Sequence, residues 1–196
     1  MCGDEHVLDM GCGRGAVLSL VAKRVPRGRS VGLDLWTGDQ SGNSPEATRR
    51  NLDAEGVRKS CALATADMTA MPFHDATFDL VVSSLAIHNI RSREGRTRAI
   101  EEAVRVLKPG GRLLIADLMW TGAYARRLRA RGMADVSRRR LDWRFWYGGP
   151  WMVMVSGLVT ATKPAEPEGL SSPSLLLWRT TYGACRIALV ARWPAG

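Results

Sequence analysis

The sequence contains little cysteine, and the cysteines follow no metal-binding or disulfide pattern. Four cysteines occur among 196 residues, with no CxxC pair and no regular spacing. This excludes a zinc module built on paired cysteines and a disulfide-stapled scaffold, and it is typical of a reducing compartment. A chain of this length buries enough surface to fold without either aid. We therefore predict a cytoplasmic protein with no metal site.

Long apolar runs and a targeting signal are also absent from the sequence. No stretch approaches the ~18 uninterrupted apolar residues that a membrane-spanning helix needs. The N-terminal sequence MCGDEHVLDM carries acids where a secretory signal carries basic residues and an apolar segment. We expect no integral membrane association.

Acidic residues are outnumbered by basic ones, which is the one extreme property of the composition. There are 28 basic and 19 acidic residues, 24 of the basic ones are arginine, and the net charge is +9. The arginines are densest between residues 126 and 144. Such a cluster attracts nucleic acid or an acidic substrate, but the simpler interpretation is a solvated helix face and strand edge. Aromatic residues are scarce in it before Trp143, which disfavours a stacking surface for single strands.

Short apolar runs alternate with longer helical patterns along most of the chain. This order is typical of an α/β protein with a parallel sheet. Strands are predicted at 7–10, 30–35, 62–66, 78–87 and 111–118, and helices at 16–25, 45–55, 92–107 and 124–131.

Turn residues and the remaining runs complete the predicted organisation. Ser44 is a candidate N-cap before Pro45, and LKPGG, ending at Gly111, is expected to close a helix in a turn. Runs at 134–142 and 152–162 have no helix between them, which predicts an antiparallel hairpin at a sheet edge. The proline-rich stretch after Lys163 looks like a linker. We predict one domain at 1–163 and a C-terminal extension at 164–196 that is not an independent domain.

A glycine loop follows the first predicted strand. Gly11, Gly13 and Gly15 lack side chains, so a ligand can approach the backbone closely beside the N-terminus of the next helix. Gly11, Gly13 and Ala16 also satisfy the relaxed dinucleotide pattern GxGxxG/A. Because a lone match of this kind is weak, a nicotinamide-dependent dehydrogenase remains an alternative at this point.

Three acids, Asp9, Asp34 and Asp67, lie at the ends of the first three predicted strands. A carboxylate at Asp9 would repel a pyrophosphate and favour an ammonium group. Asp34 is where an acid accepts both hydroxyls of a ribose, as it would in a dehydrogenase. Asp67 is suited to an adenine amino group, with Leu35 and Met68 on the two faces of the ring.

Carboxyl ends of parallel strands meet at one edge of the sheet, so these acids form one row there. A ligand with an ammonium group, a ribose and an adenine, but no pyrophosphate, matches the row. S-adenosylmethionine is such a ligand, and S-adenosylhomocysteine would be its product. The simpler alternative for Asp9 and Asp67 is that they cap loop amides.

Four ordered motifs resemble those of the class I S-adenosylmethionine-dependent methyltransferases, in particular the ubiquinone and menaquinone C-methyltransferases. The motifs are VLDMGCGRG, VGLDLW, ADMTAMPFHDATFDLVVSSLAIHNI and VLKPGGRLLIAD, within residues 7–163. The resemblance implies a Rossmann-like, doubly wound, mostly parallel sheet of seven strands in the order 3-2-1-4-5-7-6, with strand 7 antiparallel.

The resemblance also implies roles for individual residues. Gly11, Cys12 and Gly13 would line the methionine part of the cofactor, and Ser84 with Leu85 would lie at its amino-acid end near the sulfur. Cys12 is otherwise a small buried filler rather than a nucleophile. The predicted cofactor-binding residues are Asp9, Gly11, Cys12, Gly13, Gly15, Asp34, Leu35, Asp67, Met68, Ser84 and Leu85.

His88 is the histidine that the motifs bring closest to the transferred methyl group, and it is the candidate catalytic residue. It is either a general base or orienting group, or a pocket wall that exchanges no proton. Methyl transfer from a sulfonium has a good leaving group, so alignment alone supplies roughly 7 to 11 kcal/mol. A general base adds only ~10²–10⁴-fold.

The expected activity is methyl transfer to a small, partly apolar acceptor. Members of the resembled family usually have helices before the glycine loop that cap the substrate pocket, whereas six residues precede Val7 here. The cap is therefore expected to be missing, unless the aromatic segment 143–152 or the C-terminal extension replaces it. One alternative is an S-adenosylmethionine-binding protein with weak or no turnover. A nucleic-acid-directed methyltransferase is the other, disfavoured because no NPPY or DPPY follows the fourth strand.

Overall fold

The computed structural model describes residues 2–37, 42–141 and 157–165, which belong to one compact unit ending at Ala165. No helix in these ranges combines the length and apolar character that a bilayer crossing requires. The elements are β1 (His6–Met10), α1 (Ala16–Arg24), β2 (Arg29–Asp34), α2 (Pro45–Ala54), η1 (Arg58–Ser60), β3 (Cys61–Thr65), β4 (Phe78–Ser84), η2 (Ile87–Asn89), α3 (Arg93–Val106), β5 (Leu107–Asp117), α4 (Thr121–Ala130), β6 (Ala134–Arg140) and β7 (Gly157–Thr162).

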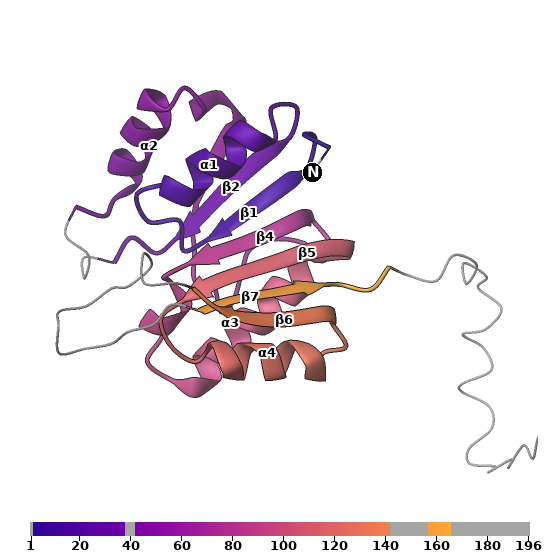
Figure 1. The fold of residues 1–196 in the computed structure, drawn as a ribbon. Helices are drawn as coiled ribbons and strands as arrows, with labels where there is room; N and C mark the ends of the chain where they lie inside the picture. The colour runs from indigo at the N-terminus through magenta and orange to yellow at the C-terminus, as the bar shows by residue number, and fades with distance from the viewer. Residues whose placement is uncertain (1, 38–41, 142–156, 166–196) are drawn as a thin grey trace, which may run out of the picture. The chain divides into compact units, whose positions relative to one another are not determined.

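The strands form a seven-stranded sheet in the order β3-β2-β1-β4-β5-β7-β6 (Figure 1). The neighbours from β3 to β5 are all parallel. Strand β7 is antiparallel to both β5 and β6. The predicted fold class is therefore confirmed, including the strand order and the antiparallel seventh strand.

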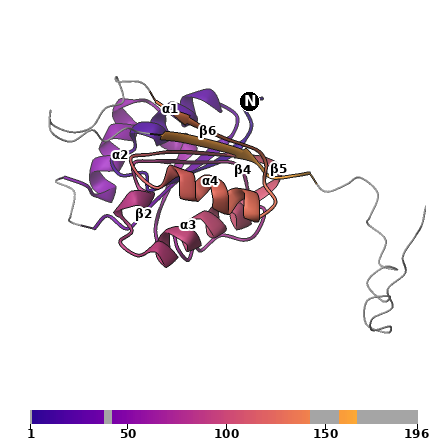
Figure 2. The ribbon, with the colours of Figure 1, turned by 60° about the horizontal axis from the view of Figure 1, so that its bottom comes forward.

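Helices cover both faces of the sheet, and β1 shows how its residues alternate between the two layers. Val7 packs in a cluster with Val17 and Val21 of α1. Leu8 and Met10 belong instead to the largest core cluster, which includes buried residues of α3 and α4. Figure 2 shows α3 and α4 side by side along one face of the sheet. Burial on both faces explains why the central strands are almost continuously apolar.

The start of α2 follows the expected capping chemistry. The Ser44 side chain accepts a hydrogen bond of 3.1 Å from the Ala47 amide, and Pro45 occupies the first helical position. Ser92 caps α3 in the same way, accepting from the Gly95 amide at 2.9 Å. Both helices therefore begin close to where the sequence predicts.

The fourth strand ends earlier than predicted. Strand β4 stops at Ser84, whereas the sequence predicted a strand through Ile87. The reason is the backbone of Leu85, whose φ of 53° is outside the range of a strand. The chain then forms the short helix η2, which includes His88. Because the chain turns at Leu85, His88 lies on η2 and does not continue the line of β4.

The fifth strand starts earlier than predicted. The segment expected to be a turn, Lys108–Gly111, lies within β5, which begins at Leu107. Its extra residues form an irregularity opposite β4, where Phe78 pairs with Leu107 but Leu80 pairs with Arg112. The predicted hairpin exists as the β6 and β7 pair. The aromatic segment 143–152 and residues 166–196 of the extension lie outside the described residues.

Candidate functional site

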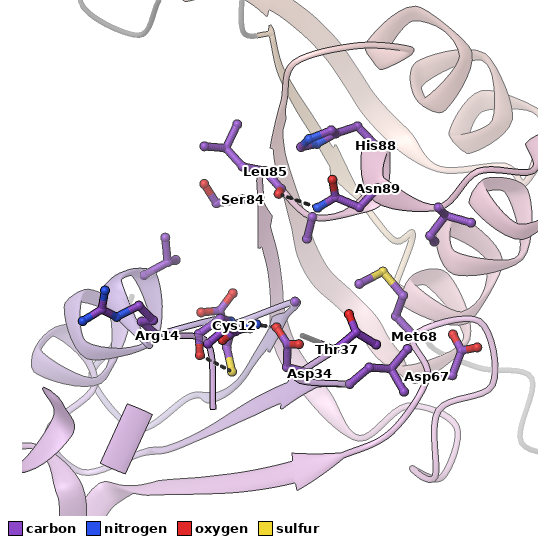
Figure 3. A pocket seen from close by; sticks show the side chains of 18 of the residues that line it. Cys12, Arg14, Asp34, Thr37, Asp67, Met68, Ser84, Leu85, His88 and Asn89 are labelled. Atoms are coloured by element: carbon purple, nitrogen blue, oxygen red, sulfur yellow. Dashed lines mark hydrogen bonds between the residues drawn. The ribbon is translucent and has the colours of Figure 1, made fainter. Parts of the chain in front are cut away.

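A cavity of about 840 Å³ lies at the carboxyl ends of β1, β2, β3 and β4 (Figure 3). It brings together ten of the eleven predicted cofactor-binding residues and also His88. The predicted residues that line it are Asp9, Gly11, Cys12, Gly13, Asp34, Leu35, Asp67, Met68, Ser84, Leu85 and His88.

The glycine loop is held against β2 and α2 by hydrogen bonds. The amides of Gly11 and Cys12 both donate to the Leu33 carbonyl, at 2.8 and 3.1 Å. The Gly13 carbonyl accepts from the Thr48 hydroxyl at 2.7 Å. These hydrogen bonds fix the backbone of the glycine loop where it lines the cavity.

Gly11 must be glycine for two reasons. Its φ is +80°, and an added Cβ would lie only 2.2 Å from the Cβ of Ala86, which packs directly against it. Gly15 does not line the cavity. It is the N-cap residue of α1, and an added Cβ would meet Thr48 at 3.0 Å. Gly15 is thus a packing position, and the predicted cofactor contact at this residue finds no support in the cavity.

Asp9 is 1% exposed, and neither carboxylate oxygen has a hydrogen-bond partner within the described residues. The pKa of Asp9 is raised to about 7, chiefly by burial and to a smaller extent by the nearby charge of Asp34, while the backbone of Leu18 acts in the opposite direction. Asp9 therefore makes no hydrogen bond within the described residues that would identify it as a loop cap. A buried carboxyl without a partner, in the wall of a cavity, is suited to a cationic group of a ligand.

Asp34 links the end of β2 to the glycine loop. One carboxylate oxygen accepts from the Gly13 amide and the other from the Trp36 amide, each at 2.8 Å. A carboxylate has about four acceptor sites, so each oxygen can accept another hydrogen bond. The side chain is only partly buried and lines the cavity. Its remaining acceptor sites are therefore available to a ligand in the cavity.

Near the ends of β2 and β3, where the predicted nucleoside part would lie, the cavity combines apolar surface with one exposed acid. Leu35 is 49% exposed, which leaves apolar area for a ligand to cover. Met68 is partly buried beside it in the cavity lining. Asp67 uses one oxygen to accept from the Thr69 amide at 2.7 Å and has its other oxygen available. Asp67 is therefore both a loop cap and a candidate acceptor for a ligand amino group.

Cys12 is 6% exposed and packs in a small apolar cluster with Leu18 and Leu52. Burial raises the pKa of its thiol strongly, and the charges of Asp9 and Asp34 add to this effect. A thiol that holds its proton so firmly is a poor nucleophile. The interpretation of Cys12 as a buried filler therefore agrees with its surroundings.

The other end of the cavity carries His88. Figure 3 shows His88, Ser84 and Leu85 together at the top of the view, opposite Asp34 and Asp67. The His88 ring nitrogen Nδ1 lies 2.5 Å from Oδ1 of Asp117. Asp117 is fully buried at the end of β5 and also accepts from the Tyr124 hydroxyl at 3.2 Å.

Sequence reasoning missed Asp117 and several lining residues. Asp117 ends a strand in the same way as Asp9, Asp34 and Asp67, and this shared position is the signal that would have found it. The additional residues that line the cavity lack a comparable pattern in the sequence, and they include Arg14, Thr37, Asn43, Asn89, Ile90 and Leu118.

Comparison with known proteins decides the family. Residues 8–115, more than half of the chain, match a family model described as a methyltransferase domain. The chain belongs to the class I S-adenosylmethionine-dependent methyltransferases. The ubiquinone/menaquinone biosynthesis C-methyltransferase UbiE of Ruegeria sp. is 35% identical over 113 residues, covering 58% of this chain and 42% of that protein. The chain thus matches about two fifths of the length of this curated relative.

Solved structures share the fold of this chain. The [4+2]-cyclase SpnF has a TM-score of 0.68 and 20% identity, covering 85% of this chain and 77% of that chain. The 1,6-didemethyltoxoflavin-N1-methyltransferase of Burkholderia thailandensis, with bound S-adenosylhomocysteine, has a TM-score of 0.62 and 18% identity, covering 82% of this chain and 72% of that chain. At these identities the likeness concerns the fold alone.

The residues of the cavity fit the cofactor of this methyltransferase family. Asp9 offers an unpartnered buried carboxyl for an ammonium group. Asp34 offers further acceptor sites for a ribose, and Leu35 offers exposed apolar surface for an adenine. Gly11 and Gly13 line the same cavity with backbone alone, which lets a ligand approach the chain closely.

Proposed function

We propose that the protein binds S-adenosylmethionine in this cavity and transfers its methyl group to a small-molecule acceptor. The observation that carries the proposal is the row of Asp9, Asp34 and Asp67 beside a glycine bend, in one cavity of about 840 Å³. A dinucleotide would bring a pyrophosphate close to Asp9, where a buried carboxyl disfavours a second negative group.

Each end of the cavity has its own task in this proposal. Asp9 attracts the ammonium group, Asp34 accepts the ribose hydroxyls, and Leu35 with Met68 holds the adenine. The bound sulfonium supplies an activated methyl group. We define the acceptor end as the cavity lining around His88, which consists of Ser84, Leu85, His88, Asn89, Ile90 and Leu118. Holding the acceptor in line with the methyl group there supplies most of the rate increase.

A small acceptor with apolar surface suits this end of the cavity better than a nucleic acid. Leu85, Ile90 and Leu118 are apolar, and the family match includes small-molecule methyltransferases such as UbiE. The arginines at 138–140 are exposed on β6 at the sheet edge. Charged side chains on an edge strand also prevent edge-to-edge association, so they do not require a nucleic-acid partner.

A second candidate is binding without turnover. A shared fold does not imply a shared reaction, and the cyclase SpnF has the same fold as this chain. We further propose that residues 1–163 form the cofactor-binding domain. The described cysteines Cys2, Cys12 and Cys61 are free thiols, which supports a cytoplasmic location.

Two measurements test the proposal. Calorimetric titration of the full chain with S-adenosylmethionine is expected to show one binding site, and NAD at the same concentration is expected to give no heat. Incubation with donor carrying an isotopically labelled methyl group in a small-molecule extract, followed by mass spectrometry, should show a labelled product. Binding without a labelled product would favour the second candidate, and absence of binding at millimolar donor would remove both.

A further inference from the structure

Asp117 is a buried carboxylate behind His88, and all of its contacts are with hydrogen-bond donors or a histidine. It is 0% exposed. Its oxygens accept from the amides of His88 and Leu118, each at 2.9 Å, and from the Tyr124 hydroxyl at 3.2 Å. The fourth contact, at 2.5 Å, is with Nδ1 of the His88 ring. These partners come from η2, the end of β5 and α4, so the carboxylate is fixed in orientation.

Tyr124 helps to fix the Asp117 carboxylate because its hydroxyl keeps its proton and can continue to donate a hydrogen bond. Burial raises the pKa of Tyr124 strongly, and the charge of Asp117 and its hydrogen bond add to the effect. The Arg96 charge lowers that pKa only partly. Arg96 is itself occupied, since it donates to the Ile90 and Arg91 carbonyls and stacks on Trp120 at 3.8 Å.

These contacts determine which nitrogen of His88 carries the proton. A carboxylate that already accepts three hydrogen bonds is best served by a fourth donor, which requires a proton on Nδ1. The neutral ring then has its lone pair on Nε2. No described residue bonds Nε2, and His88 lines the cavity with its side chain 16% exposed. The lone pair is therefore available to a molecule bound at the acceptor end.

We propose that Asp117 and Tyr124 are positioning residues that hold His88 as a general base, and that the acceptor carries a dissociable hydroxyl. This inference rests on the proposed methyl transfer and specifies its acceptor. The acceptor end is lined by the apolar Leu85, Ile90 and Leu118 and by the polar Ser84 and Asn89, so it fits an acceptor with an apolar body that carries polar groups. An aromatic hydroxyl, with a pKa of about 10 in the phenol of tyrosine, is within reach of a histidine base.

The step balances with His88 as the only base. The acceptor O–H bond breaks, and its proton goes to Nε2 of His88. The oxygen forms a bond to the methyl carbon while the carbon–sulfur bond breaks, and that electron pair stays on sulfur to give the neutral thioether. The histidinium, stabilised by Asp117, then releases its proton to water. Either transfer releases one proton in total, but transfer to a ring carbon would also require removal of a carbon-bound proton to restore the aromatic ring.

Nitrogen-15 NMR of histidine-labelled full-length protein tests this inference without relying on turnover. At pH 8.5, we expect His88 to show a protonated Nδ1 and an unprotonated Nε2, with the exposed His6 and His74 as internal references. In the complex with S-adenosylhomocysteine, added catechol should shift the Nε2 signal. Its dimethyl ether, 1,2-dimethoxybenzene, has no proton to donate and should leave the signal unchanged.

Two variants separate positioning from folding. Asp117→Asn is expected to move the proton of His88 to Nε2 and therefore to abolish the catechol response. The equivalent Asp→Asn change in the serine-protease triad also leaves the histidine in the wrong tautomer. Tyr124→Phe removes one hydroxyl from the same carboxylate, so it should keep the amide spectrum and weaken the response several-fold. An Nε2-protonated or doubly protonated ring in the parent protein, or equal responses to catechol and its ether, would overturn the inference. Failure of S-adenosylhomocysteine to bind in calorimetry would instead remove the proposed function itself.

Discussion

The backbone amide of Gly13 donates a hydrogen bond of 2.8 Å to Oδ2 of Asp34, joining the glycine loop to the end of β2. The carboxylate that is proposed to hold the ribose therefore also fixes the loop that is proposed to hold the methionine part. One residue serves both halves of the ligand.

Replacing Asp34 with asparagine should separate these two effects. The amide oxygen of Asp34→Asn can still accept from Gly13, but the charged acceptor for the ribose is lost. We expect affinity for S-adenosylmethionine to fall about 10- to 100-fold, because hydrogen bonds to charged groups contribute about 1.5–3 kcal/mol. Calorimetric titration measures this, with the exposed Asp53→Asn on α2 as the matched control. Equal affinities in both variants would contradict the assignment.

Asp9→Asn is expected to stabilise the ligand-free protein while weakening ligand binding. The pKa of Asp9 is raised to about 7, so between pH 4 and pH 7 the folded state holds a proton that the unfolded state releases. The stability contributed by this proton is lost as pH rises through 7. The advantage of the variant over the parent should thus grow from pH 5 to pH 8.

Urea denaturation at pH 5, 6, 7 and 8 checks the effect of Asp9→Asn. A shift of three pKa units corresponds to about 4 kcal/mol, which is an upper limit for the difference. The variant should also bind S-adenosylmethionine less tightly, since it no longer offers a charge to the ammonium group. A stability difference that does not change with pH would show that Asp9 is ionised throughout this range.

Gly11→Ala should destabilise the protein more than Gly56→Ala. Both glycines have positive φ, +80° and +72°, so both variants lose about 1–2 kcal/mol from the backbone alone. Only at Gly11 does the new Cβ lie 2.2 Å from Ala86, which adds about 1–3 kcal/mol of overpacking. Thermal or chemical denaturation measures the difference, and equal losses would mean that the loop and Ala86 can move apart freely.

Leu33→Ala should mainly lower the stability of the protein, whereas Leu35→Ala should mainly lower its affinity for S-adenosylmethionine. Leu33 is fully buried, so its truncation should cost about 2–5 kcal/mol of stability. Leu35 is 49% exposed in the cavity, so its truncation should change stability by only about 0.5 kcal/mol. Because the proposed adenine covers Leu35, affinity for S-adenosylmethionine should fall about 10-fold in Leu35→Ala. Unchanged affinity would remove Leu35 from the adenine site.

The sheet and most of the cavity were predictable because they depend on local patterns. Apolar strands, capping residues such as Ser44, and acids at strand ends can each be identified within a short window of sequence. The family resemblance supplied the strand order, which local patterns do not encode. The acids at the ends of β1, β2 and β3 then had to meet at one edge, because those strands are parallel.

Other features were not predictable because they depend on contacts between distant residues. The early end of β4 follows from the positive φ of Leu85, which no residue type at that position announces. Asp117 and His88 are 29 positions apart and meet only when η2 turns toward the end of β5. The burial of Asp9 depends on the packing of α1 against the sheet, so its raised pKa also required the structure.

A crystal structure of the full chain with S-adenosylhomocysteine tests the central claim most directly. The account predicts the ribose hydroxyls at Asp34, the adenine between Leu35 and Met68 with its amino group toward Asp67, and the ammonium group facing Asp9. A nucleoside bound elsewhere on the protein, or bound in this cavity with its ribose away from Asp34, would contradict it.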